Sequence, residues 1–180
     1  MSKIGKKNIN IPKESSIKIE GSNLTIKGPK GTKTLSINDK IFSSKLNETE
    51  FQILPLQKKI DKKTSIMWGT YRSLINNAVV GVSAGHEKIL ELNGVGFRAN
   101  LKGDILNLQI GFSHDVNFKI PKDIKIAVEK QTIIKIIGVD KELVSKTAAD
   151  IKNLKPVEPY KGKGIKERGQ FVLRKEGKKK

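Results

Sequence analysis

Two stretches of the chain alternate apolar and polar residues on both sides of a short glycine-containing turn. In the first, Ile17-x-Ile19 and Leu24-x-Ile26 flank the turn, and in the second, Ala99-x-Leu101 and Leu106-x-Leu108-x-Ile110 flank it. Alternation with a period of two is typical of strands with one buried face, and each turn predicts a tight hairpin. Gly21, Leu24 and Ile26 are followed 82 residues later by Gly103, Leu106 and Leu108, so the sequence contains an internal repeat.

Two further stretches carry apolar residues at three- and four-residue spacing, which predicts one helix in each repeat. The first comprises Met67, Tyr71, Leu74, Ile75, Ala78 and Val82, and the second Val144, Ala148, Ile151 and Leu154. The short strands Phe51-x-Ile53 and Ile134-x-Ile136 precede them. A rival offset of 109, suggested by Ile11-Pro12-Lys13 and Ile120-Pro121-Lys122, places the first helix over the Lys-rich end of the chain, so it is rejected.

The predicted fold class is therefore α+β, with two tandem repeated domains, each an antiparallel sheet packed against one helix, plus a basic C-terminal extension. We place the boundary near Gly81 to Gly85, where Gly-Val-Ser-Ala-Gly interrupts the helical pattern. The expected parts are an N-terminal α+β domain over residues 1–82, a C-terminal α+β domain over 83–159 and the extension over 160–180. Because both predicted helices end before residue 160, we expect the folded part to survive removal of the extension.

The charge balance points to a polyanionic partner. The chain carries 36 Lys and Arg against 18 Asp and Glu, a formal net charge of +18. Such an excess opposes compaction through self-repulsion, and binding to phosphates relieves it with release of counterions. A general bias of the sequence toward Lys is the alternative, but it does not explain a twofold excess of bases over acids. The charge therefore predicts nucleic-acid binding, which we assign mainly to the C-terminal domain and extension.

Several classes of site are excluded or disfavoured by what the sequence lacks. It contains no cysteine, so disulfides, thiolate metal sites and cysteine nucleophiles are ruled out. No apolar run follows the basic N-terminus, and no stretch approaches the roughly 20 apolar residues of a membrane span. The lack of cysteine permits a cytosolic compartment, and we expect no cofactor, no metal, no membrane partner and no small-molecule substrate.

The strongest candidate site lies in residues 160–180, which hold nine bases and two acids. Glycines alternate with lysines at its start, so the backbone is expected to approach RNA closely while the lysines reach phosphates. Tyr160 offers a ring that can stack on an unpaired base. A solvated tail is the alternative for such a charge run. The expected RNA-binding residues here are Tyr160, Lys161, Gly162, Lys163, Gly164, Lys166, Arg168 and Lys175, whereas Lys178 to Lys180 are generic charge.

A second cluster combines Asn93-Gly94-Val95-Gly96-Phe97-Arg98 with Gly111-Phe112-Ser113-His114-Asp115. The first run does not fit a dinucleotide loop, because Arg98 leads into a strand and the third glycine is missing. Its glycines are expected to permit a bulge or a close backbone approach. Arg98 is a candidate phosphate contact, with a solvated strand residue as the alternative. Neighbouring side chains on an extended chain point apart, which disfavours an acid–base pair of His114 and Asp115.

The N-terminal residues Lys3, Lys6 and Lys7 form a second basic segment. Contact with RNA and plain solvation are equally good explanations for it. No P-loop spacing, paired carboxylates or His-x-x-His pattern occurs, so the sequence gives no candidate catalytic residue.

At Glu158-Pro159-Tyr160-Lys161-Gly162-Lys163-Gly164-Ile165 the sequence resembles the bacterial family of large-subunit ribosomal protein six. Gly94-Val95-Gly96-Phe97-Arg98, Gly111-Phe112-Ser113-His114 and the terminal run from Arg174 also resemble segments of that family. The resemblance runs from near residue 3 to the end, with Pro156-Val157 before Glu158 as the main departure from the family pattern.

The resemblance implies two tandem α+β domains and a structural, non-enzymatic role. It further implies binding to 23S-type ribosomal RNA near the stalk base and the factor-binding region, alongside neighbouring ribosomal proteins. The expected place is the ribosome of the cytoplasm, with an organellar ribosome as the alternative. The rival functions are a DNA-architectural protein that coats duplex without sequence preference, and an RNA-directed enzyme, which would need an acid–base pair.

Overall fold

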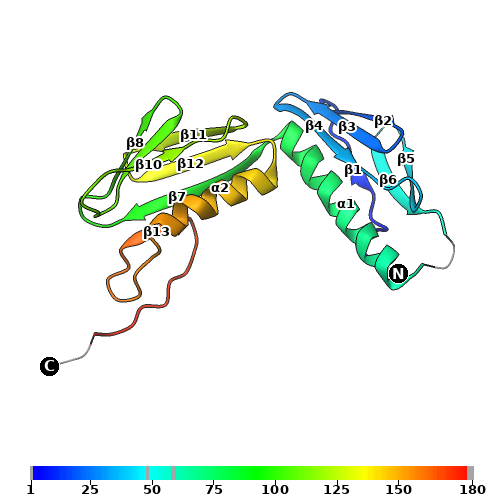
Figure 1. Cartoon of the computed structure of the whole chain (residues 1–180). Helices are drawn as coiled ribbons and strands as arrows, with labels where there is room; N and C mark the ends of the chain where they lie inside the picture. Colours follow the sequence, from blue (N-terminus) through cyan, green and yellow to red (C-terminus); the bar gives the residue numbers. More distant parts are fainter. Residues whose placement is uncertain (1, 48, 58–59, 178–180) are drawn as a thin grey trace. The chain divides into compact units, whose positions relative to one another are not determined.

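A computed structural model describes residues 2–47, 49–57 and 60–177 of the chain. The backbone divides into two compact units. One contains the residues up to Gly85 together with Val139–Lys141, and the other contains His86–Gly138 and the residues from Glu142 onward (Figure 1). Each unit has its own hydrophobic core.

The first unit packs one long helix against two small antiparallel sheets. The sheets have the strand orders β1-β6-β5 and β2-β3-β4. The elements are β1 (Ile9–Asn10), β2 (Ser16–Glu20), β3 (Asn23–Gly28), β4 (Gly31–Ser36), β5 (Phe42–Leu46), β6 (Glu50–Pro55) and α1 (Lys62–Ser83).

The second unit has the same plan with one additional strand. Its sheets have the orders β10-β9-β8 and β11-β12-β7-β13, again with antiparallel pairing throughout. The elements are β7 (His86–Asn93), β8 (Arg98–Lys102), β9 (Ile105–Gln109), β10 (Val116–Lys119), β11 (Ile124–Glu129), β12 (Ile133–Gly138), α2 (Lys141–Leu154) and β13 (Gly164–Glu167).

The α+β fold of two tandem repeats is confirmed, and the repeat extends to strand register. Ile17 pairs with Ile26 in the β2–β3 hairpin, and Ala99 pairs with Leu108 in the β8–β9 hairpin, 82 residues later. The turn glycines Gly21 and Gly103 share a φ of +58°. Alternation sets this register, because a slip by one residue would turn the apolar side chains toward solvent. Each unit divides its strands between two sheets, which corrects the prediction of one sheet in each domain.

The helices differ more than the hairpins do. Helix α1 has 22 residues and α2 has 14. Helix α1 continues through Gly81 and ends at Ser83, inside the Gly81 to Gly85 stretch where its end was expected, and the Ala84 N–H still donates to the Val80 carbonyl. Gly81 is buried, and tertiary packing overrides the weak helix propensity of a single glycine.

The buried face of α1 is anchored by Trp68. Its side chain is only 3% exposed, and its Nε1 donates a 2.8 Å hydrogen bond to the Ile53 carbonyl on β6. This bond satisfies the one polar atom of the indole, so the ring is buried without an unpaired donor. The helix is thereby fixed to the sheet that contains β6.

Strand β13 brings part of the supposed extension into the fold. It pairs with β7, with Ile165 opposite Leu92, and the Ile165 side chain is fully buried in the second core. The placement of all of residues 160–180 outside the folded part is therefore wrong, and their removal would take Ile165 out of the second core. Within the described residues, no helix is long and apolar enough to cross a membrane.

Candidate nucleic-acid interface

A closed loop connects the end of α2 to β13. The Glu158 N–H donates to the Lys163 carbonyl at 2.8 Å, and the Gly162 N–H donates to the Glu158 carbonyl at 3.0 Å. Tyr160 is 55% exposed at the tip, with Lys161 and Lys163 exposed beside it. The loop therefore presents an aromatic ring and two cations to solvent, the combination that single-stranded nucleic acids bind.

Gly164 makes its close approach to the protein's own backbone. The residue is buried, and a Cβ atom there would lie 2.6 Å from both the Pro156 oxygen and the Val157 Cα. Its φ of +139° also disfavours any other residue. The expected reason for this glycine, access to RNA, is thus replaced by packing of β13 against the residues that follow α2. A Cβ on Gly162 would lie 3.2 Å from the Arg174 guanidinium.

Lys166 and Arg168 share a carboxylate partner within the same sheet. Glu91 on β7 lies 3.2 Å from Lys166 Nζ and 3.5 Å from Arg168 Nε. Lys166 is half-buried, whereas Arg168 stays largely exposed. Part of the positive charge that the sequence offered to phosphates is therefore balanced inside the protein.

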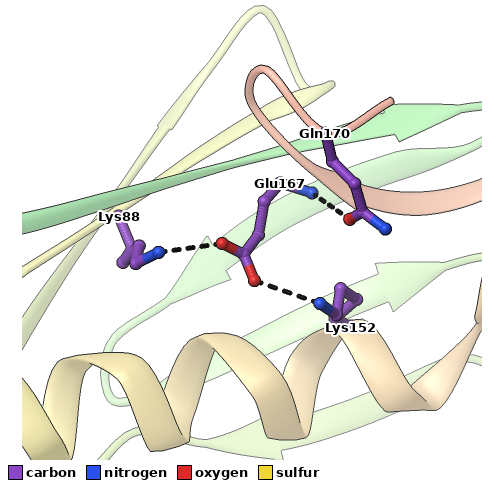
Figure 2. Close-up of polar contacts among 4 residues, drawn as sticks. All are labelled: Lys88, Lys152, Glu167 and Gln170. Atoms are coloured by element: carbon purple, nitrogen blue, oxygen red, sulfur yellow. Dashed lines mark hydrogen bonds and ion pairs between the residues drawn. The ribbon is translucent and has the colours of Figure 1, made fainter. Parts of the chain in front are cut away.

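Glu167 joins β13 to two other elements (Figure 2). Its carboxylate accepts hydrogen bonds from Lys88 on β7 at 2.8 Å and from Lys152 on α2 at 3.0 Å, and its N–H donates to the Gln170 side chain at 3.3 Å. The hydrogen bond from Lys88, followed by that from Lys152, lowers the pKa of Glu167 below its usual value. The carboxylate thus links β13, within the C-terminal extension, to both the sheet and the helix.

Beyond Gln170 the described chain has no regular secondary structure. Phe171 is 86% exposed and Leu173 72% exposed. One backbone bond returns to the loop, because the Lys175 N–H donates to the Pro159 carbonyl at 2.9 Å. The Lys175 side chain is exposed. Lys178, Lys179 and Lys180 lie outside the described residues.

The glycine-rich cluster of the second unit surrounds Phe97. The ring is buried, and a Cβ on Gly94 would lie 3.0 Å from it, while a Cβ on Gly111 would lie 3.2 Å from it. The expected close approach is therefore made by the Phe97 ring. Arg98, the next residue, is exposed at the start of β8, as a phosphate contact requires.

His114 and Asp115 are engaged with different neighbours. The His114 ring stacks on Phe112 with centroids 6.3 Å apart, and Asp115 accepts from the Gln109 side chain at 3.4 Å. In the part of the chain that the structure describes, no group of three metal-ligating side chains gathers. The geometry thus gives no support to an acid–base pair at this turn.

The N-terminal lysines lie on the first unit, in a segment that is packed against α1. Lys3, Lys6 and Lys7 are exposed. Between them, a Cβ on Gly5 would lie 2.5 Å from the Trp68 ring, and the Arg72 guanidinium donates to the carbonyls of Lys7 and Asn8. These lysines therefore project from a fixed backbone, in a different unit from the cations of residues 160–175.

Comparison with known proteins decides the family. The family model of ribosomal protein L6 matches residues 11–85 and 93–168, one segment for each repeat. This chain belongs to the ribosomal protein L6 family. It is 47% identical to large ribosomal subunit protein uL6 of Phenylobacterium zucineum (strain HLK1), and 46% identical to that of Novosphingobium aromaticivorans. Both alignments span 180 residues and cover both chains completely.

This L6-family chain has two candidate contact residues that we did not predict from the sequence. Lys155, just after α2, places its Nζ 4.5 Å from the centroid of the Phe112 ring, which is 47% exposed. A large aromatic residue within a glycine-containing turn was the available signal for Phe112. Lys155 carried no such signal, because its proximity to the ring arises only from the tertiary fold.

Proposed function

We propose that the chain is a structural, non-enzymatic constituent of the large ribosomal subunit. In this proposal it binds 23S-type ribosomal RNA near the stalk base and factor-binding region, and supports subunit assembly and translation. Its place is the ribosome of the cytoplasm, with an organellar ribosome as the alternative. Its partners are the RNA and adjacent ribosomal proteins.

The observation that carries the proposal is the similarity along the complete chain to proteins named as large-subunit protein uL6. The net charge of +18 supports it independently, since phosphate contacts relieve the self-repulsion of such a chain. The exposed ring and cations of the loop after α2 add a surface of suitable chemistry.

The proposed contacts fall into two groups. Tyr160, Lys161, Lys163, Lys175 and Arg98 are exposed on the second unit and are assigned the main RNA contacts. Arg168 can contribute through its exposed guanidinium, and Lys166 only in part, because both are paired with Glu91. To Gly162 and Gly164 we assign the role of allowing the backbone conformation of the loop. Lys3, Lys6 and Lys7 of the first unit form a separate, weaker contact.

Sedimentation tests the proposed assembly. A tagged copy of the full chain, expressed in a bacterial cell and resolved on a density gradient at physiological salt, should comigrate with the large subunit. A parallel gradient at low magnesium, which separates the subunits, assigns the partner. Recovery at the top of the gradient, or with the small subunit, would contradict the proposal.

A truncation tests the contribution of the C-terminal residues to binding. Removal of residues 171–180 deletes five bases and one acid but leaves β13 in place. The slope of log K against log salt for binding to large-subunit RNA should fall by roughly 0.7 to 0.9 for each phosphate that the shortened chain no longer neutralises. As a control, Phe171→Ser with Leu173→Ser removes the exposed apolar groups and should leave the slope unchanged. An unchanged slope in the truncated chain would mean that these bases are only solvated.

A further inference from the structure

The second unit contains an open hollow of about 610 Å³ beside the loop after α2. Its floor is apolar, with Phe97 8% exposed and Ile110 1% exposed. Val95, which is 95% exposed, and Phe112 stand at its edge. Two neighbouring apolar side chains that are exposed beside a hollow are typical of a surface that binds a partner.

The glycines of two turns shape this hollow. A Cβ at Gly94 or at Gly111 would lie within 3.2 Å of the Phe97 ring. Either substitution would displace the ring, because both contacts are shorter than ordinary van der Waals contacts. The two glycine-containing turns therefore set the position of the floor.

The charged groups of the hollow are two ammonium groups and one carboxylate. Lys155 covers the Phe112 ring through a cation–π contact at 4.5 Å, and Lys163 and Glu158 also line the space. A cation–π contact at an exposed site is weak, whereas stacking of a base on an aromatic ring is stronger. An incoming base can therefore replace the ammonium group over the ring.

We infer that this hollow receives one unpaired nucleotide of the ribosomal RNA, an inference that rests on the proposed function. The base stacks on Phe112 in place of the Lys155 ammonium, and Lys155 then pairs with the phosphate of the same nucleotide. Lys163 neutralises an adjacent phosphate. Glu158, which also lines the hollow, repels phosphate and can accept a hydrogen bond from a base amino group.

The chemistry of the lining favours a nucleotide over a protein side chain. An apolar side chain would bury Phe112 and Val95 but would leave the displaced Lys155 ammonium without a new anionic partner. A nucleotide supplies both a flat apolar surface and a phosphate within one residue. It also suits the single-stranded elements of RNA, whose splayed bases stack on aromatic side chains.

Base-reactive chemical probing of the RNA complex tests this inference. Wild-type protein should protect at least one unpaired base of large-subunit RNA, and Phe112→Leu should abolish that protection while the rest of the footprint persists. Loss of one base–aromatic stack should weaken RNA binding by about 5- to 150-fold. Phe112→Trp retains a stacking surface and should restore both properties, so a merely structural defect of the leucine variant would be recognised.

Lysine variants form the second arm of the experiment. Lys155→Met removes the ammonium group at the hollow, and Lys125→Met, at an exposed position of β11, removes the same charge elsewhere. Only Lys155→Met should alter the same protected base. An unchanged footprint and affinity in Phe112→Leu, with RNA binding intact, would overturn the nucleotide site alone. Absence of any RNA binding by the wild-type protein would overturn the proposed function as well.

Discussion

Replacing Ile165 with alanine tests whether β13, within the C-terminal extension, belongs to the folded core. Its side chain is 0% exposed and lies in the second core cluster. Deleting the buried methyl and methylene groups of an isoleucine removes their transfer free energy and leaves a cavity. We therefore expect the free energy of unfolding of the second unit to fall by about 2 to 5 kcal/mol.

The expected effect is large on the temperature scale. For a domain of this size, 1 kcal/mol shifts the melting temperature by about 4 to 8 °C. Ile165→Ala should therefore lower the melting temperature of the second unit by at least about 8 °C. Ile165→Val, which removes a single methylene, should cost about 0.5 to 1.5 kcal/mol and give an intermediate shift.

Thermal unfolding followed by circular dichroism measures this shift, and the first unit provides an internal reference because it has a separate core. Leu173→Ala is the matched control, since Leu173 is an aliphatic residue of the same extension but is 72% exposed. Its effect should stay within about 0.5 kcal/mol. An equally small effect of Ile165→Ala would refute the assignment of β13 to the core.

Three further predictions concern individual contacts. Gly164→Ala should lower the free energy of unfolding, measured in urea, by more than about 2 kcal/mol, because its Cβ would clash with the Pro156 oxygen. Gly169→Ala, whose Cβ would have no neighbour within 4 Å, should lower it by only about 1 kcal/mol because of its positive φ. The lowered pKa of Glu167 means that its pairing stabilises the fold above about pH 4.5 and is lost as the pH falls through the lowered pKa. Glu167→Gln should therefore destabilise the protein by about 1 kcal/mol at most near neutral pH, and the difference from wild type should shrink in an acid titration of stability. Trp68→Phe leaves the Ile53 carbonyl without its 2.8 Å hydrogen bond. The free energy of unfolding of the first unit should therefore fall by about 1 to 3 kcal/mol, while that of the second unit should not change.

The hairpins could be predicted from the sequence because their information is local. Ile17, Ile19, Leu24 and Ile26 alternate around a two-residue turn, so the pattern and the turn together set both the pairing and the buried face. The same local pattern, repeated 82 residues later, predicts the second hairpin and hence the tandem architecture.

Strand β13 could not be predicted in the same way, because its information is not local. Gly164–Glu167 contains one apolar residue within a run of glycines and charges, which gives no alternation. Its partner β7 lies far earlier in the sequence. The acids that pair with Lys166 and Lys152 are likewise identified only by the fold, so composition overstates the positive charge available to a partner.

The placement of β13 changes how the C-terminal extension, residues 160–180, should contribute to RNA binding. The loop with Tyr160, Lys161 and Lys163 is tied at one side to α2 and at the other to β13, and backbone hydrogen bonds close it. Its side chains therefore start from a fixed backbone, and little backbone ordering is required when a ligand binds. Residues 171–177 have one described backbone bond to the loop and no regular structure, so ordering them on RNA carries a larger entropic cost. For equal numbers of phosphate contacts, the loop should therefore contribute more to affinity than the last ten residues, although both contribute equally to the salt dependence.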